Sequence, residues 1–304
     1  MGMLKKLRAL VYDPLYIGRN SLIFVFGAVL FYVVTGAMSR MSLVGLLGFV
    51  MAYNSVYYLN DLKDYEEDKK DPVKWKTKPL LNGSMTKKEM VATYAFYLVV
   101  GLAVSFYVGA LFGSLVALML VLNLLHSFLF KKVYFLLFSN MIIIQSLKMT
   151  LGWMSAAQSF DSFPWFFVLF SGCVYSLGYL VYKKERKLVE VNREKFRMGR
   201  LEYMRYGIKK IFRTLLREPI NAFFLMLTLA MYLLSYVLYS FRLHLLMMIA
   251  VSVLMSVSLK HVKGEKLNLY ATYHVIIDML YASIIITFYL CSTLPELVAL
   301  NALL

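Results

Sequence analysis

The chain is built from long runs of hydrophobic residues that alternate with short polar segments. A run of roughly 18 or more apolar residues with few charges is long enough to cross a bilayer as an α-helix. Nine windows meet this criterion, at residues 21–39, 42–59, 90–108, 111–130, 133–155, 163–182, 220–240, 242–259 and 270–293. The pattern therefore predicts an all-α polytopic membrane protein with nine transmembrane helices in a bundle.

Basic residues are distributed very unevenly between the two ends of these nine windows. The amino-terminal segment and the four loops on its side of the membrane hold 30 of the 33 Lys and Arg residues. Cytoplasmic loops carry an excess of Lys and Arg, so we expect a cytoplasmic amino terminus and an external carboxyl terminus. The five basic segments are residues 1–20, 60–88, 131–132, 183–218 and 260–266.

The overall composition agrees with an integral protein of the cell membrane. Hydrophobic residues make up 61% of the 304 residues, and the net charge is +16. In a soluble chain this charge would indicate nucleic-acid binding, but here the asymmetry of the loops accounts for it. We therefore expect the lipid bilayer as a partner and no nucleic acid. The two cysteines lie within apolar runs and indicate neither a disulfide framework nor a thiolate metal site.

Two of the expected cytoplasmic loops, residues 60–88 and 183–218, are much longer than the others. Each follows an even-numbered window, and the two are four windows apart, which suggests that they face one pocket. The sequence contains no separate soluble domain. We therefore expect residues 1–304 to form a single transmembrane domain in which these two loops cap an active site on the cytoplasmic side.

An acidic run with the sequence NDLKDYEED occupies residues 60–68, directly after the second apolar window. On a continuous helix, about 100° per residue would bring Asp61, Asp64 and Asp68 onto one stripe. Carboxylates gathered at the mouth of an apolar segment need a cation between them. Mg²⁺ bound to a diphosphate fits, because it takes one or two carboxylates together with phosphate oxygens. The alternative is a solvated helix end whose acids are screened by Lys63, Lys69 and Lys70.

Two groups of cations are candidates for holding the remaining charge of a phosphate. One group follows the acidic run at Lys74, Lys76 and Lys78. The other lies in the second long loop, at Lys183, Lys184 and Arg197. For most basic residues of these loops, contact with anionic lipid headgroups is the simpler interpretation. It is weakest for the lysines close to the acidic run.

Three further charged residues are candidates for the same site. Lys148 lies within the fifth apolar window, where a charge costs roughly 2.5–3.5 kcal/mol on insertion scales. We therefore expect its side chain to face the bundle interior and to contact a phosphate. Glu190 and Glu194 lie four residues apart, so both would share one helical face and hold a second metal ion. Ordinary ion pairs within the helix are the alternative for these two glutamates.

These features together resemble the UbiA superfamily of intramembrane prenyltransferases. The resemblance covers most of the chain and rests on the nine windows, the acidic run, the Lys-Pro-Leu-x-x-Gly segment at 78–83 and the charged loop after the sixth window. It implies a helical bundle around an apolar cavity that opens to lipid, with Mg²⁺ as the cofactor. It also implies that the metal–diphosphate ligands are Asn60, Asp61, Asp64 and Asp68.

The second charged loop departs from the usual pattern of this superfamily, which has Asp-x-x-x-Asp there. Glu190 and Glu194 are the nearest substitutes. The two long loops are instead similar to the branch that attaches phosphoribose to a polyprenyl phosphate. That local similarity implies substrate contacts by Lys74, Lys78, Lys148, Lys183, Lys184, Arg197 and Glu202.

Three functions are compatible with the sequence. The first is transfer of a prenyl group from a polyprenyl diphosphate to an aromatic or lipid acceptor. The second is transfer of phosphoribose from phosphoribosyl diphosphate to a polyprenyl phosphate. A membrane transporter or non-catalytic scaffold would explain the apolar windows and the charge asymmetry, but not the acidic run beside the Lys-Pro-Leu-x-x-Gly segment. We expect an enzyme, with prenyl transfer as the leading interpretation.

Overall fold

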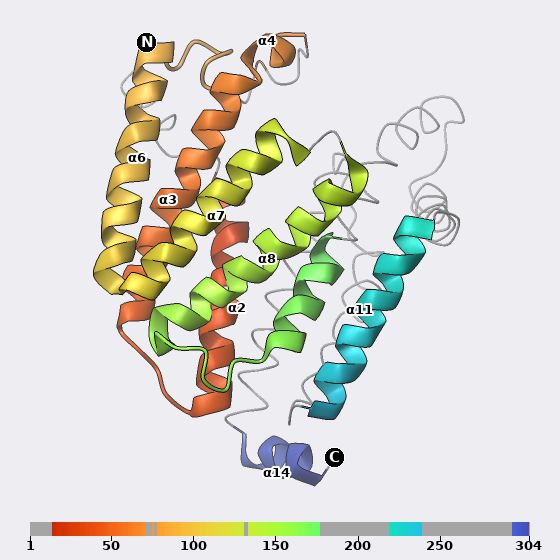
Figure 1. The fold of residues 1–304 in the computed structure, drawn as a ribbon. Coiled ribbons are helices and arrows are strands. Elements are labelled where there is room, and N and C mark those ends of the chain that lie inside the picture. Colours follow the sequence, from red (N-terminus) through yellow and green to blue (C-terminus); the bar gives the residue numbers. More distant parts are fainter. Residues whose placement is uncertain are drawn as a thin grey trace, which may run out of the picture. The chain divides into compact units, whose positions relative to one another are not determined.

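A computed structural model describes residues 14–70, 75, 78–130, 133–176, 219–238 and 294–303 of the chain (Figure 1). Within these residues the secondary structure is helical and contains no strand. The labelled helices are α2 (Pro14–Thr35), α3 (Met41–Lys63), α4 (Tyr65–Asp68), α6 (Lys87–Val108), α7 (Ala110–Phe128), α8 (Tyr134–Ala157), α11 (Pro219–Leu238) and α14 (Pro295–Leu303). The prediction of an all-α chain is thus confirmed for the described residues.

Four helices among the described residues are long and apolar enough to cross a membrane. They are Met41–Lys63, Lys87–Val108, Ala110–Phe128 and Phe135–Ala157, and they match the second to fifth apolar windows. Shorter apolar helices at Asn20–Thr35 and Trp165–Ser176 fall in the first and sixth windows, and α11 falls in the seventh. The last two windows and the loop 183–218 lie outside the described residues, so the count of nine stays a prediction.

The chain forms two compact units, which we describe separately. Unit 1 contains Met1–Lys132 and Leu147–Asp161, and unit 2 contains Val133–Ser146 and Ser162–Leu304. The boundary falls within α8, so its amino-terminal part belongs to unit 2 and its carboxyl-terminal part to unit 1. The acidic run and the segment that follows it belong to unit 1.

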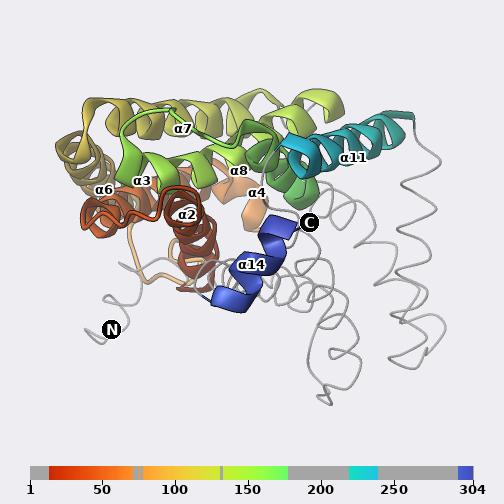
Figure 2. The same cartoon turned by 90° about the horizontal axis from the view of Figure 1, so that it is seen from below.

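Unit 1 is held together by close contacts between its helices. In both views α6 runs beside α3 (Figures 1 and 2). Gly101 of α6 lies against α3, since a Cβ placed on it would come within 2.3 Å of the backbone nitrogen of Ala52. An aromatic cluster joins α2, α3 and α7, with ring centroids 5.2 Å apart for Phe24 and Phe49 and 6.3 Å apart for Phe24 and Phe112. This packing fixes the part of α3 that precedes the acidic run.

Two glycines bring α2 and the carboxyl-terminal part of α8 into backbone contact. A Cβ on Gly27 would come within 1.9 Å of the carbonyl oxygen of Met149, and a Cβ on Gly152 within 1.9 Å of the carbonyl oxygen of Phe24. Small residues at such crossings allow membrane helices to approach closely. The close crossing also brings Lys148, next to Met149, against α2.

Unit 2 contains a smaller apolar core. Buried residues of α8 and of the helix Trp165–Ser176 form it, with Leu227 of α11 packed against them. A Cβ on Gly172 would come within 2.2 Å of the hydroxyl oxygen of Ser146, so these two helices also approach closely. The core residues are Leu137, Phe138, Met141, Ile142 and Cys173.

The α2–α8 crossing predicts that Gly152→Ala destabilises the protein. The added methyl group would collide with backbone rather than with a movable side chain, and overpacking of this kind costs about 1–3 kcal/mol. Gly18→Ala in α2 is the matched control, because nothing lies within 4 Å of its Cβ position and alanine favours a helix. Unfolding in detergent measures both variants. Equal stability of Gly152→Ala and Gly18→Ala would contradict the close crossing.

Candidate functional site

The acidic run does not form one continuous helix. Helix α3 ends at Lys63, and Asp64 has the non-helical backbone angles φ −87° and ψ 8°. Its N–H still donates to the carbonyl oxygen of Asn60 at 2.8 Å, and the four-residue helix α4 follows at once. The expectation of a single helical stripe for Asp61, Asp64 and Asp68 was therefore wrong, because the backbone breaks between the first and last of these residues.

Asp61 and Asp68 are nevertheless brought to a single cation, the ammonium group of Lys78. Its Nζ lies 2.6 Å from Oδ1 of Asp61 and 2.6 Å from Oδ2 of Asp68. The two carboxylate side chains are only 1% and 2% exposed, and that of Lys78 is 21% exposed. The break at Asp64 thus turns two acids seven positions apart toward one buried point. Asp64 itself is half-buried.

The charge of Lys78 is set by these partners. Burial by itself lowers the pKa of a lysine, because it penalises the ammonium form. The attraction of Asp61 and hydrogen bonds to both carboxylates act in the opposite direction and leave the pKa of Lys78 raised above its ordinary value. Lys78 is therefore fully charged at neutral pH and offsets part of the repulsion between the carboxylates.

A turn between Lys78 and α6 carries the ammonium group to the acids. The N–H of Ser84 donates to the carbonyl oxygen of Pro79 at 2.9 Å. Gly83 has φ +70°, a left-handed conformation that glycine adopts without strain. Immediately afterwards Thr86 and Glu89 form a reciprocal capping box that begins α6. The predicted Lys-Pro-Leu-x-x-Gly segment is thus an ordered turn.

Apolar contacts fasten the same turn to unit 1. Met85, at the end of the turn, forms a buried cluster with Tyr58 of α3 and Met90 of α6, and Leu80 packs against this cluster. Lys78 and the carboxylate of Asp61 are therefore held by two segments that are fixed to each other.

Asn60, the first residue of the acidic run, is held by the end of α7. The hydroxyl group of Ser127 donates to its Oδ1 at 2.6 Å. Lys63 also contacts Ser127, because its Nζ donates to the carbonyl oxygen of Ser127. The same Nζ lies 4.4 Å from the ring centroid of Phe128. Lys63 thus contacts α7 through a hydrogen bond and a cation–ring contact. In the alternative interpretation of the acidic run, a solvated helix end, Lys63 would instead screen the acids.

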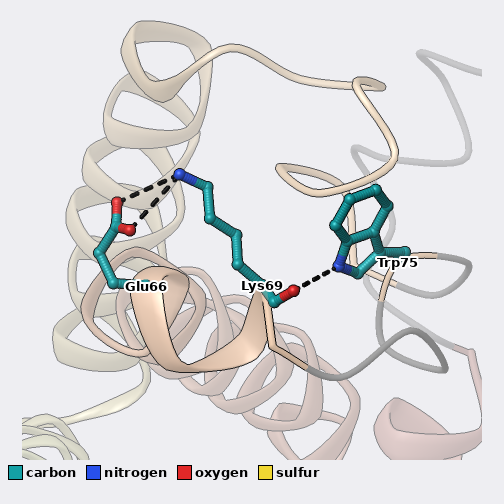
Figure 3. Close-up of polar contacts among 3 residues, drawn as sticks. All are labelled: Glu66, Lys69 and Trp75. Atoms are coloured by element: carbon teal, nitrogen blue, oxygen red, sulfur yellow. Dashed lines mark hydrogen bonds and ion pairs between the residues drawn. The ribbon is translucent and has the colours of Figure 1, made fainter.

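Glu66, an exposed acid of α4, belongs to a separate and weaker set of contacts, shown in Figure 3. Nζ of Lys69 lies 3.4 Å from the carboxylate of Glu66, and the indole N–H of Trp75 donates to the carbonyl oxygen of Lys69 at 2.9 Å. The Lys69 ammonium also lies 4.4 Å from the ring centroid of Tyr65. Exposed ion pairs contribute little to stability, so this face contrasts with the buried pairs of Lys78.

Lys148 lies in the interior of unit 1, as the sequence predicted, with 2% of its surface exposed. Its Nζ donates to Oδ1 of Asn20 at 2.7 Å and lies 4.5 Å from the ring centroid of Tyr53. The amide of Asn20 in turn donates to the hydroxyl oxygen of Tyr57 at 2.6 Å. Tyr57 and Tyr53 precede Asp61 by one and two turns of α3, roughly 6 and 12 Å along its axis. The phosphate contact of Lys148 stays a prediction.

The donor set suits a small divalent cation. Oxygens of Asp61 and Asp68 meet at one point, and Mg²⁺ is commonly held by one or two carboxylates that leave further positions for water and phosphate. Among the described residues, no group of three or more His, Cys, Asp or Glu side chains is arranged to hold a metal. A metal at this site would therefore need a ligand besides carboxylates, and Asn60 is adjacent in sequence.

Several predicted site residues lie outside the described part of the chain. These are Lys74, Lys76, Lys183, Lys184, Glu190, Glu194, Arg197 and Glu202.

The structure also adds three residues that the sequence analysis did not single out, namely Ser127, Asn20 and Tyr57. Asn20 and Tyr57, which contact each other, are 37 positions apart, and Ser127 is 67 positions from its partner Asn60, so only the fold reveals these contacts. A polar residue at the end of an apolar window was the available signal for Ser127.

Solved structures of UbiA homologues from Archaeoglobus fulgidus share this fold. One, bound to GPP and Mg²⁺, has a TM-score of 0.59 over 94% of this chain and 98% of the other, at 15% identity. A second structure of a UbiA homologue from this organism has a TM-score of 0.60 over 94% and 99%, also at 15% identity. A third, bound to DMAPP and Mg²⁺, has a TM-score of 0.50 at the same identity and coverage as the second.

Sequence comparison identifies the family directly. No functionally curated protein matches the chain. The sequence profile of the UbiA prenyltransferase family, however, matches residues 21–294, which is most of the chain. The chain therefore belongs to the UbiA prenyltransferase family.

Proposed function

We propose that this protein is a Mg²⁺-dependent intramembrane prenyltransferase that moves a prenyl group from a polyprenyl diphosphate to an aromatic or lipid acceptor. The observation that carries the proposal is the convergence of two buried carboxylates, Asp61 and Asp68, on one cationic point. Family membership supports it, as do the homologues bound to Mg²⁺ together with GPP or DMAPP.

Asp61 and Asp68 would hold the metal together with Asn60, and Asp64, which the described structure does not group with the other two acids, would turn toward them to complete the set. A bound Mg²⁺ would supply charge withdrawal from the departing diphosphate. The arrangement of this chain's own residues prepares the site for that role. The two carboxylates are buried against one ammonium group, and the ordered turn at 78–85 keeps Lys78 beside them.

Lys78 would bind a diphosphate oxygen once a metal compensates the carboxylates. Its side chain is the most exposed of the three, at 21%, so its ammonium group is the one best able to turn to a ligand. Lys148, buried beside Tyr53 of α3, would contribute a second positive charge to the phosphates. From the second loop and the adjacent segment we assign further phosphate contacts to Lys74, Lys183, Lys184 and Arg197, a substrate contact to Glu202, and a second metal to Glu190 and Glu194.

We further propose that residues 1–304 act as one catalytic domain, capped by loops 60–88 and 183–218 on the cytoplasmic side of the cell membrane. The concentration of 30 of the 33 Lys and Arg residues on one side of the nine predicted windows supports this orientation. The diphosphate would then lie at the cytoplasmic surface while the prenyl chain extends between apolar helices.

Phosphoribosyl transfer to a polyprenyl phosphate is the second candidate. The similarity of both long loops to that branch favours it, together with Glu190 and Glu194 in place of the usual second aspartate motif. In this case the same carboxylates would hold Mg²⁺ with phosphoribosyl diphosphate, a soluble donor that enters from the cytoplasm.

The carboxylates are tested by Asp61→Asn and Asp68→Asn. Each change keeps the side-chain volume but removes a charged metal ligand, so we expect turnover to fall below about a tenth of wild type, a barrier increase of more than roughly 1.4 kcal/mol. Glu67→Gln is the matched control, because Glu67 is an exposed acid of the same run and should tolerate the change. Retention of activity by both aspartate variants would refute their assignment as ligands.

The buried ion pairs predict a metal-dependent stability defect in Lys78→Met. Removing one partner from a buried ion pair costs about 3–5 kcal/mol, because the two carboxylates lose their counter-charge. We expect this loss in detergent with a chelator, and partial recovery when Mg²⁺ is added. Lys69→Met serves as the control, since its pair with Glu66 is exposed. If both variants unfold alike in chelator, Lys78 does not stabilise the carboxylates.

The donor is identified by two parallel reactions with the purified protein and Mg²⁺. One contains labelled prenyl diphosphates and candidate aromatic and lipid acceptors, and the other contains labelled phosphoribosyl diphosphate with polyprenyl phosphate. We expect label to enter a lipid-soluble product in the first reaction. Product in the second reaction alone would replace our leading proposal with the phosphoribosyl alternative.

A further inference from the structure

We propose that Ser127 is a positioning residue that orients the side chain of Asn60 toward the bound metal and diphosphate. This inference rests on the proposed function, since it assumes that Asn60 belongs to the ligand set. Ser127 lies at the end of α7, 67 positions after Asn60. The sequence of the acidic run therefore does not indicate this contact.

The bond between the two side chains is short and protected from water. The hydroxyl group of Ser127 donates to Oδ1 of Asn60 at 2.6 Å, and Ser127 is 4% exposed. A carbonyl oxygen has two acceptor positions. The hydroxyl group occupies one of them and leaves the other for a metal ion or a donor group. Ser127 thereby fixes the amide without consuming its capacity to bind.

Ser127 is itself held in place from α3. The carbonyl groups of the last helical turn lack partners within their own helix, and a cation near that end is favourable. Lys63 provides a hydrogen-bond donor and a positive charge at this end of α7, because its Nζ donates to the carbonyl oxygen of Ser127. The same Nζ lies over the ring of Phe128. Asn60 and Lys63 are three positions apart and so lie on one face of α3. Asn60 and Lys63 of α3 therefore both form hydrogen bonds with Ser127 of α7.

This support is needed because Asn60 stands at the end of a helix. Asp64, four residues later, already has non-helical backbone angles. An asparagine side chain in such a position would otherwise adopt several orientations. Partners of this kind, which orient a metal ligand without touching the metal, typically affect metal affinity by about 10–100-fold.

The test measures Mn²⁺ binding by electron paramagnetic resonance, with inorganic diphosphate present and no turnover required. We expect Ser127→Ala to weaken Mn²⁺ binding by about tenfold or more, and Ser127→Thr, which keeps the hydroxyl group, to recover most of the affinity. Ser105→Ala is the matched control. Ser105 is a buried serine of α6 whose hydroxyl group donates to the carbonyl oxygen of Gly101 at 2.7 Å, so its loss should leave Mn²⁺ binding unchanged.

A double-mutant cycle decides whether the effect passes through Asn60. We expect Asn60→Ala/Ser127→Ala to bind Mn²⁺ no more weakly than Asn60→Ala alone, because the hydroxyl group then has no amide to orient. Additive losses, or an unchanged affinity in Ser127→Ala, would overturn the inference. Failure of the proposed function would look different, since Mn²⁺ would then still bind normally to an Asp61→Asn/Asp68→Asn variant.

Discussion

The carboxylates of Asp61 and Asp68 lie almost completely buried, and the Lys78 ammonium group lies 2.6 Å from an oxygen of each. Two such charges repel each other strongly where water is scarce, so they remain together only with a cation between them. The rest of the site follows from this requirement. The backbone breaks at Asp64 so that α4 can return Asp68 to Asp61, and the turn at 78–85 brings a lysine to the same point.

Helix packing in unit 1 gives this arrangement a firm base. Close crossings at Gly101 and Gly152 fix α3 and α2 against their neighbours, and the capping box of α6 ends the turn that carries Lys78. The end of α7 holds Asn60 from another side. Three segments that are distant in the sequence thus determine the positions of a few polar atoms at the end of an apolar helix. Under the proposed function, such preorganisation would let a metal–diphosphate complex bind without a large rearrangement of its two aspartate ligands.

Sequence reasoning succeeded where a signal is local and failed where it depends on the chain returning to itself. The hydrophobic runs located α3, α6, α7 and α8 closely, because length and apolarity alone identify a spanning helix. The cost of a charge in such a run correctly placed Lys148 in the interior. The break at Asp64 was not predicted from the sequence, because one helical periodicity was extended through residues 61–68. The pairing of Lys78 with the acids and the bond from Ser127 were also not predicted, because both depend on tertiary contacts.

We infer that Mg²⁺ and a prenyl diphosphate bind at the point where Asp61, Asp68 and Lys78 meet. An experimental structure with Mg²⁺ and a non-cleavable prenyl diphosphate tests it most directly. We expect Mg²⁺ at about 2.0–2.1 Å from oxygens of both aspartates, with Nζ of Lys78 in contact with the diphosphate instead of the carboxylates. Metal and diphosphate bound elsewhere, with Lys78 still between the two aspartates, would contradict it.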